Sequence, residues 1–177
     1  MKNYYNSKER KFTILNLEVR TLSKTDLIIV IFFAAAIILH FLLRHFYPEA
    51  KVLISDMIFI LVGLLTIATP FGIRFRSIYF SAIWIVLNLL LLLNIQSLAL
   101  FPLFTFITYH VIRFIFWKVH KLEFIPFIAG RWHWIRYVSK IEGRGGYKED
   151  RVYQMLLILI GLAILLFCIL NFRNGPN

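Results

Sequence analysis

Long apolar stretches with at most one charged residue each alternate with short charged segments along this chain. Residues 27–46, 52–72 and 152–172 are the first, second and last of these stretches. Each is close to the length of about 20 apolar residues that a helix needs to cross a membrane. The pattern therefore predicts three transmembrane helices at these positions.

Local signals for helix ends agree with these stretches. Ser23 and Asp26 stand just before the first stretch in the arrangement of a capping box, in which Ser23 accepts a backbone N–H and Asp26 lies in the first turn. Pro48 ends the first helix, Pro70 closes the second, and Asn174 opens a polar stop after the last.

Residues 77–117 contain a single charge, Arg113. One helix of that length would extend about 60 Å at 1.5 Å per residue, which is twice the thickness of the hydrocarbon core. The polar cluster 94–97, followed by Pro102, is the one polar interruption and marks a turn. This stretch is therefore predicted to be a hairpin of two spans, which makes five spans in total; a re-entrant hairpin would make four.

The distribution of positive charge gives an orientation. The net charge is +11, and sixteen Lys and Arg lie in 1–26, 72–77 and 118–151, against Arg44, Lys51 and Arg173 on the other side. Positive residues collect on the cytoplasmic side of membrane proteins. The expected fold is an all-α polytopic membrane protein of a cytoplasmic (inner or plasma) membrane, with five transmembrane helices, the N-terminus inside and the C-terminus outside.

Four parts follow from this topology. They are a cytoplasmic N-terminal arm (1–26), a four-span transmembrane bundle (27–117), a basic cytoplasmic loop (118–151), and the fifth span with a short outer tail (152–177). In the arm, Leu15, Leu17 and Val19 alternate with polar residues, as in a β-strand. A lone strand needs a partner, which would be another subunit, another protein or the membrane surface; an amphiphilic arm at the interface is the alternative.

The basic loop mixes aromatic and cationic residues. Arg131, Trp132, Trp134 and Arg136 lie close together in it, and both kinds of side chain are well solvated among lipid headgroups. We expect an interfacial helix here that contacts anionic headgroups. Arginine and aromatic residues also bind nucleic acid, but the loop lies between two spans, so a nucleic-acid partner is not favoured.

Polar residues within the spans are the next candidates for function, because such residues are costly in a membrane. They are Asp56, Asn88, Thr105, Thr108, Tyr109 and Arg113. They could line a polar cavity or pore. Alternatively, the Asn and Thr side chains form hydrogen bonds between helices, and Arg113 reaches the cytoplasmic headgroups or pairs with an acid.

Catalytic and metal-binding patterns do not stand out. Cys168 is the one cysteine, which excludes an intrachain disulfide, and His40 and His110 fall in different spans, a weak basis for haem. We expect no catalytic residue, no cofactor and no metal. The composition fits a non-enzymatic membrane subunit or accessory protein that acts through protein and lipid contacts, with a protein partner or a homo-oligomer. A self-assembling channel or membrane-perturbing effector, for example in bacterial defence, is the alternative.

Overall fold

A computed structural model describes residues 13–14, 17–19, 21–46, 51–68, 74–93, 97–126, 138–139, 144–145 and 148–173. Within these residues the chain forms five α-helices and one short 3-10 helix. They are α1 (Lys24–Phe46), α2 (Lys51–Ala68), α4 (Ile78–Leu92), η1 (Ser97–Ala99), α5 (Leu100–His120) and α6 (Lys148–Arg173). The protein is therefore helical, as the apolar stretches predict.

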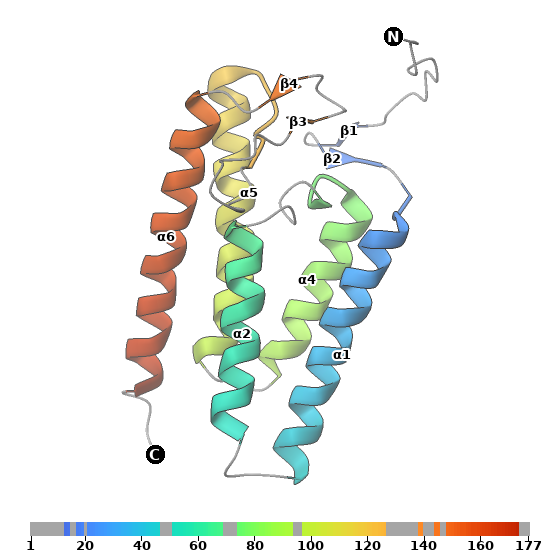
Figure 1. Cartoon of the computed structure of the whole chain (residues 1–177), viewed down its shortest axis with the longest axis vertical. Coiled ribbons are helices and arrows are strands. Elements are labelled where there is room, and N and C mark those ends of the chain that lie inside the picture. The colour runs from blue at the N-terminus through green and yellow to red at the C-terminus, as the bar shows by residue number, and fades with distance from the viewer. Residues whose placement is uncertain are drawn as a thin grey trace.

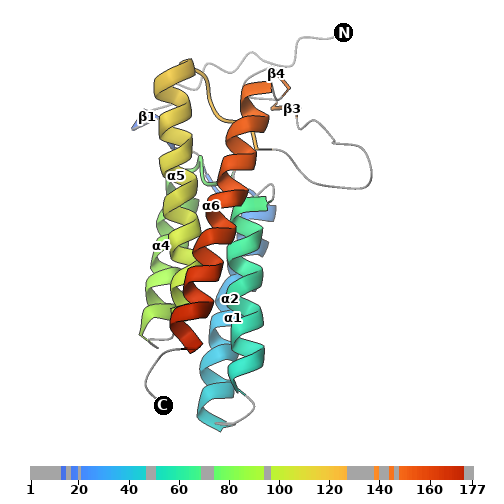
Figure 2. The ribbon, with the colours of Figure 1, turned by 90° about the vertical axis from the view of Figure 1, so that its left-hand side faces the viewer.

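The helices run up and down next to one another in a single bundle (Figure 1). Helix α5 lies in its middle and packs against α2, α4 and α6, while α1 packs against α2 and α4. The first residues of α1, α4 and α6 share one end of the bundle with the last residues of α2 and α5 (Figures 1 and 2). We call this the basic end, because the sequence segments that join these helix termini carry most of the Lys and Arg residues.

Several helix ends follow the signals in the sequence. The capping box is confirmed: Asp26 N–H donates to Ser23 Oγ at 3.1 Å, and Ser23 N–H donates to Asp26 Oδ2 at 2.9 Å. Helix α5 ends at Lys121, whose left-handed backbone (φ 55°) allows its N–H to reach the carbonyl of Trp117 at 2.8 Å. The helix breaks between α4 and α5, as the sequence predicts; that both helices cross the membrane stays a prediction.

Among the residues that the structure describes, three helical segments are long and apolar enough to cross a membrane: Lys24–Leu43, Leu100–His120 and Lys148–Asn171. Two further apolar segments are shorter, namely Met57–Ile67 and Ile78–Leu92. At 1.5 Å per residue α4 is about 22 Å long, less than the roughly 30 Å hydrocarbon core. Its lower end lies above those of α1 and α2 (Figure 1). The structure thus indicates membrane association, and α4 is the shortest of the five described α-helices.

The core of the bundle is aromatic. Phe75, in the turn before α4, is fully buried, and its ring centroid lies 5.0 Å from Phe106 and 5.4 Å from Trp84. Two glycines allow close helix contacts: a Cβ on Gly63 of α2 would come within 2.3 Å of the Phe101 ring, and one on Gly161 of α6 within 2.4 Å of Ile67. Small residues at helix contacts are typical of membrane bundles.

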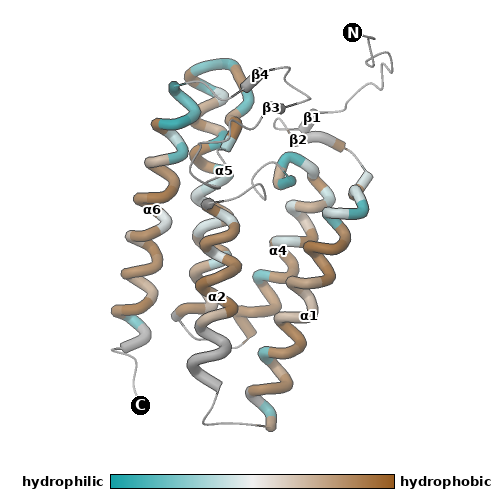
Figure 3. Tube along the Cα trace, viewed as in Figure 1, coloured by the Kyte–Doolittle hydropathy of each residue, from teal (hydrophilic) through white to brown (hydrophobic). Residues whose placement is uncertain are grey.

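The helices are apolar along most of their length (Figure 3), and many of their large apolar side chains are exposed. Phe32 of α1 is 73% exposed and Leu159 of α6 is 65% exposed. Exposed apolar side chains on this scale are unusual for a protein in water, but they match a hydrocarbon surrounding. Polar residues instead gather at the basic end (Figure 3).

The N-terminal arm differs from the single strand that its alternation predicts. Thr13–Ile14 (β1) pairs antiparallel with Leu17–Glu18 (β2), so over these residues the arm pairs with itself. In the basic loop, Val138–Ser139 (β3) pairs with Arg144–Gly145 (β4). The predicted interfacial helix, with Arg131, Trp132, Trp134 and Arg136, lies outside the described residues.

Candidate functional site

An ion pair joins the start of α1 to the connection before α4 at the basic end. The Asp26 carboxylate accepts from the guanidinium of Arg74, and its side chain is fully buried while that of Arg74 is 21% exposed. The same carboxylate also accepts the N–H of Ser23. Asp26 therefore serves twice, as a helix cap and as a tie between two elements that are 48 residues apart in the chain.

A second ion pair is more deeply buried. Arg113 Nε donates to Glu123 Oε1, and the two side chains are 5% and 7% exposed. The reversal at Lys121 makes this contact possible, because it turns the chain back along α5 after its last residue. The structure thus gives Arg113 an acidic partner, one of the two roles that the sequence leaves open for it.

A third tie connects the segment after α5 to α6. Asp150, in the first turn of α6, is fully buried and accepts the backbone N–H of Ile125 at 2.9 Å. Next to it, Phe116 and Tyr153 pack edge to face with ring centroids 5.0 Å apart. Residues 123–126 are buried by these contacts.

The three buried acids change the charge that the basic end presents. Asp26, Glu123 and Asp150 are buried, whereas five of the cations at the described helix ends are exposed. The exposed ones are Lys24, Lys118, Lys121, Lys148 and Arg151, with Glu149 as an exposed acid. Lys121 Nζ lies 5.4 Å from the centre of the Trp117 ring, a cation and aromatic pairing that suits lipid headgroups.

The other polar candidates lie along the bundle and mostly bond to their own helices. Thr105 Oγ1 donates to the carbonyls of Phe101 (3.0 Å) and Pro102 (2.9 Å), and Thr108 Oγ1 to that of Phe104 (2.8 Å). Asn88 Nδ2 donates to the Trp84 carbonyl at 2.7 Å. These bonds stay within one helix and differ from the interhelical bonds considered above.

Tyr109 and Asp56 complete the set of polar residues in the spans. Tyr109 is buried, with its ring centroid 5.5 Å from Phe75 and 6.1 Å from Phe124. It therefore lies one turn from Arg113 on the inner face of α5. Asp56 belongs to α2, but its side chain is outside the described residues.

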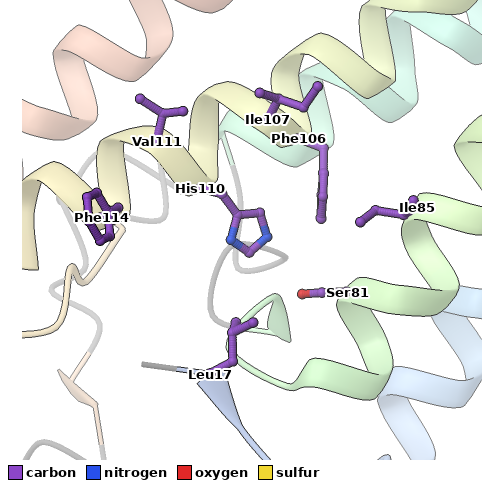
Figure 4. Close-up of a pocket in the computed structure, with 8 residues that line it drawn as sticks. All are labelled: Leu17, Ser81, Ile85, Phe106, Ile107, His110, Val111 and Phe114. Atoms are coloured by element: carbon purple, nitrogen blue, oxygen red, sulfur yellow. The ribbon is translucent and has the colours of Figure 1, made fainter. Parts of the chain in front are cut away.

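A groove opens between α4 and α5 beside Leu17 of the N-terminal arm (Figure 4). Its volume is about 450 Å³, within the range of small-molecule sites. The lining is apolar apart from one imidazole and one hydroxyl: Leu17, Ser81, Ile85, Phe106, Ile107, His110, Val111 and Phe114. Leu17 comes from β2, so the arm contributes to the wall of this groove.

Sequence reasoning missed several residues of the basic end. Glu123 and Asp150 look like ordinary loop and helix-start acids, yet both are buried. Glu123 carries a signal in retrospect, because it is a single acid within the run Leu122–Pro126 of otherwise apolar residues. Arg74 was counted as an inner-loop charge, and nothing local predicts that Asp26 binds it.

In the described part of the chain, no side chains are grouped as ligands for a metal ion or a haem. No three His, Cys, Asp or Glu residues there lie close enough to hold a metal ion. His40 packs on Phe59 with ring centroids 5.0 Å apart, whereas His110 lies 4.5 Å from Phe106. No family model matches the chain, and no similar protein was found among curated proteins or solved structures.

Proposed function

We propose that this protein is a non-enzymatic, multi-pass membrane subunit that associates with a protein partner, or with further copies of itself, and holds its basic end against an anionic cytoplasmic leaflet. In this arrangement all five helices cross an inner or plasma membrane, the N-terminus is cytoplasmic and the C-terminus is on the other side. The function of the protein then depends on the lipid headgroups and protein partners that the basic end contacts.

One observation carries the proposal: at the basic end the acids Asp26, Glu123 and Asp150 are buried, whereas the lysines are exposed. Asp26, Glu123 and Asp150 are tied inside the bundle, while Lys118, Lys121 and Lys148 remain at the surface. Each Lys or Arg near an anionic membrane surface is worth about 1 kcal/mol. The apolar outer faces of α1 and α6 add support, because they can meet lipid or the helices of a partner.

Orientation is tested at the two ends of α1. Thr21→Cys and His45→Cys are placed singly in a Cys168→Ser background, since both positions are exposed and lie at opposite ends of the helix. An impermeant maleimide should label the His45→Cys variant in intact cells (spheroplasts, if an outer membrane is present) and the Thr21→Cys variant only after permeabilisation. The opposite labelling pattern would refute the orientation.

Association is tested by purifying the chain in mild detergent and in lipid nanodiscs. We expect a particle heavier than the 21.0 kDa monomer, and a Lys148→Glu/Arg151→Glu variant should lose the associated mass. Asn171→Glu, which alters an exposed residue at the opposite end, is the control and should keep it. A monodisperse monomer under all conditions would count against the proposal.

A further inference from the structure

The groove between α4 and α5 faces outward from the bundle. Ile107, Val111 and Phe114 are 47%, 49% and 51% exposed, and Ile85 on the opposite wall is 39% exposed. All four lie on helices that the proposed function places in the membrane. In that arrangement the groove opens to the lipid, and the apolar lining of the groove suits a hydrocarbon chain.

His110 gives the groove a polar feature that a hydrocarbon chain alone does not satisfy. Its Nε2 atom is buried and has no hydrogen-bond partner within the described residues. The neighbouring hydroxyl of Ser81 already donates to the Phe75 carbonyl at 2.7 Å. A buried polar atom without a partner is unfavourable, so a ligand that offers a hydrogen-bond acceptor here gains free energy. Figure 4 shows the imidazole between Phe106, Ser81 and Leu17.

A positive charge continues the groove toward the basic end. Ile107, Val111 and Phe114 follow one another at helical spacing on one face of α5, and Lys118 is the next residue on that face. Lys118 is exposed. Along α5 toward the basic end, the groove thus offers Ile107 first, then the imidazole of His110 beside Val111, then Phe114, and last the cation of Lys118.

That order matches one class of molecule. We propose that the groove binds an anionic phospholipid of the cytoplasmic leaflet, with an acyl chain between α4 and α5, an ester carbonyl accepting from His110 Nε2–H, and the phosphate next to Lys118. This inference rests on the proposed function for its leaflet. Leu17 of the N-terminal arm closes the side of the groove near α4, so the arm packs on the bound chain.

Binding is measured by native mass spectrometry of the full chain, delipidated in a non-ionic detergent and titrated with phosphatidylglycerol or phosphatidylcholine. We expect phosphatidylglycerol to bind about five-fold more tightly, as one nearby lysine predicts. Lys118→Gln should abolish this preference. Lys148→Gln, the control, changes another exposed lysine of the basic end and should retain it; equal behaviour of the two variants would overturn the proposal.

The hydrogen bond is tested separately. His110→Leu should lower the affinity for both lipids about five-fold. His110→Gln, which keeps a hydrogen-bond donor, should retain most of the wild-type affinity. Where His110→Leu fails to fold, Ile107→Trp fills the groove from its exposed edge, and Leu159→Trp on the exposed face of α6 serves as its control. Unchanged binding in Ile107→Trp would contradict the site.

The position is mapped with a phosphatidylglycerol that carries a photoactivatable diazirine in its acyl chain. Adducts are expected on the α4 and α5 peptides that contain Ser81, Ile85 and residues 106–114. Adducts confined to other helices, or displacement by free oleate at lower concentration than by phosphatidylglycerol, would overturn the assignment. These measurements report lipid binding by the purified chain in any oligomeric state, so they can fail while the labelling and association results hold, and the reverse.

Discussion

The basic end and the middle of the bundle hold their polar side chains in different ways. At the basic end, Asp26 binds Arg74, Glu123 binds Arg113, and Asp150 accepts the N–H of Ile125, so each acid joins two separate elements. In the middle, Thr66, Thr105 and Asn88 donate to carbonyls of their own helices. The first kind of contact depends on tertiary structure, whereas the second would form in an isolated helix.

This difference indicates where the specificity of the fold lies. Lipid removes the hydrophobic driving force between helices, so contacts in the middle depend on shape. Gly63 against Phe101 and Gly161 against Ile67 are such contacts. In the proposed arrangement, headgroups and water surround the basic end, where charged groups are retained and can select which segments meet. Variants at the two regions should therefore differ in both size and kind of effect.

The largest loss is expected from Glu123→Ala. Breaking a buried ion pair by removing one member costs about 3–5 kcal/mol, because the other charge stays buried without that partner. Unfolding in mixed micelles, followed by tryptophan fluorescence, measures the change. Glu149→Ala removes an exposed acid of the same end and should change the free energy of unfolding by less than about 0.5 kcal/mol. Similar effects of the two variants would show that the Arg113–Glu123 pair is not a structural tie.

Much of the fold follows from the sequence because membrane helices are encoded locally. An uncharged stretch of sufficient length predicts its own helix, and the Ser23–Asp26 spacing predicts its cap, so α1 begins where the pattern indicates. The break between α4 and α5 is predictable for the same reason: a polar cluster cannot stay in hydrocarbon. The pairing of Thr13–Ile14 with Leu17–Glu18 was not predictable, since period-two alternation does not tell which segment a strand pairs with.

The next largest effect is expected in the middle of the bundle, from Gly63→Leu. Even a Cβ at this position would lie 2.3 Å from the Phe101 ring, so α2 and α5 must separate. Overpacking of this kind costs about 1–3 kcal/mol. Ala163→Leu on the exposed face of α6 is the control and should be neutral. Phe101→Ala, added to Gly63→Leu, should recover part of the loss; no recovery would mean that the strain arises elsewhere.

A smaller effect is expected from Asp26→Asn at the basic end. It removes the charge that binds Arg74 and weakens the bond to Ser23 N–H, but an amide oxygen can still accept. A cap and a partly exposed ion pair together contribute about 1–2 kcal/mol. Ser23→Ala, which removes the hydroxyl that accepts Asp26 N–H, should cost about 1 kcal/mol. If Asp26→Asn costs no more than Ser23→Ala, then the Arg74 bond adds nothing to stability.

The candidate site was harder to predict than the fold, because its contacts are distant in the chain. Charge counting identified the basic end, but it treats every Lys, Arg, Asp and Glu alike. It could not show that Asp150 is buried while Glu149 beside it is exposed. The groove was also missed, since His110 draws attention only when Ser81 of α4 and Leu17 of the arm come next to it.

The smallest effect is expected from Asn88→Leu, in the middle of α4. Asn88 is fully buried, its amide donates within α4, and its Oδ1 has no partner within the described residues. The amide oxygen of Asn88 is thus unsatisfied, and replacement of such an amide by an apolar side chain of similar size is nearly neutral. The free energy of unfolding should therefore change by less than about 0.6 kcal/mol in either direction.

The same variant bears on the channel alternative. In liposomes we expect no ion flux from the wild-type protein and none from Asn88→Leu, because this side chain bonds to its own helix. Flux that is present in wild type and altered by Asn88→Leu would place Asn88 along a pore and would make self-assembly, not the contacts of the basic end, the main activity of the protein.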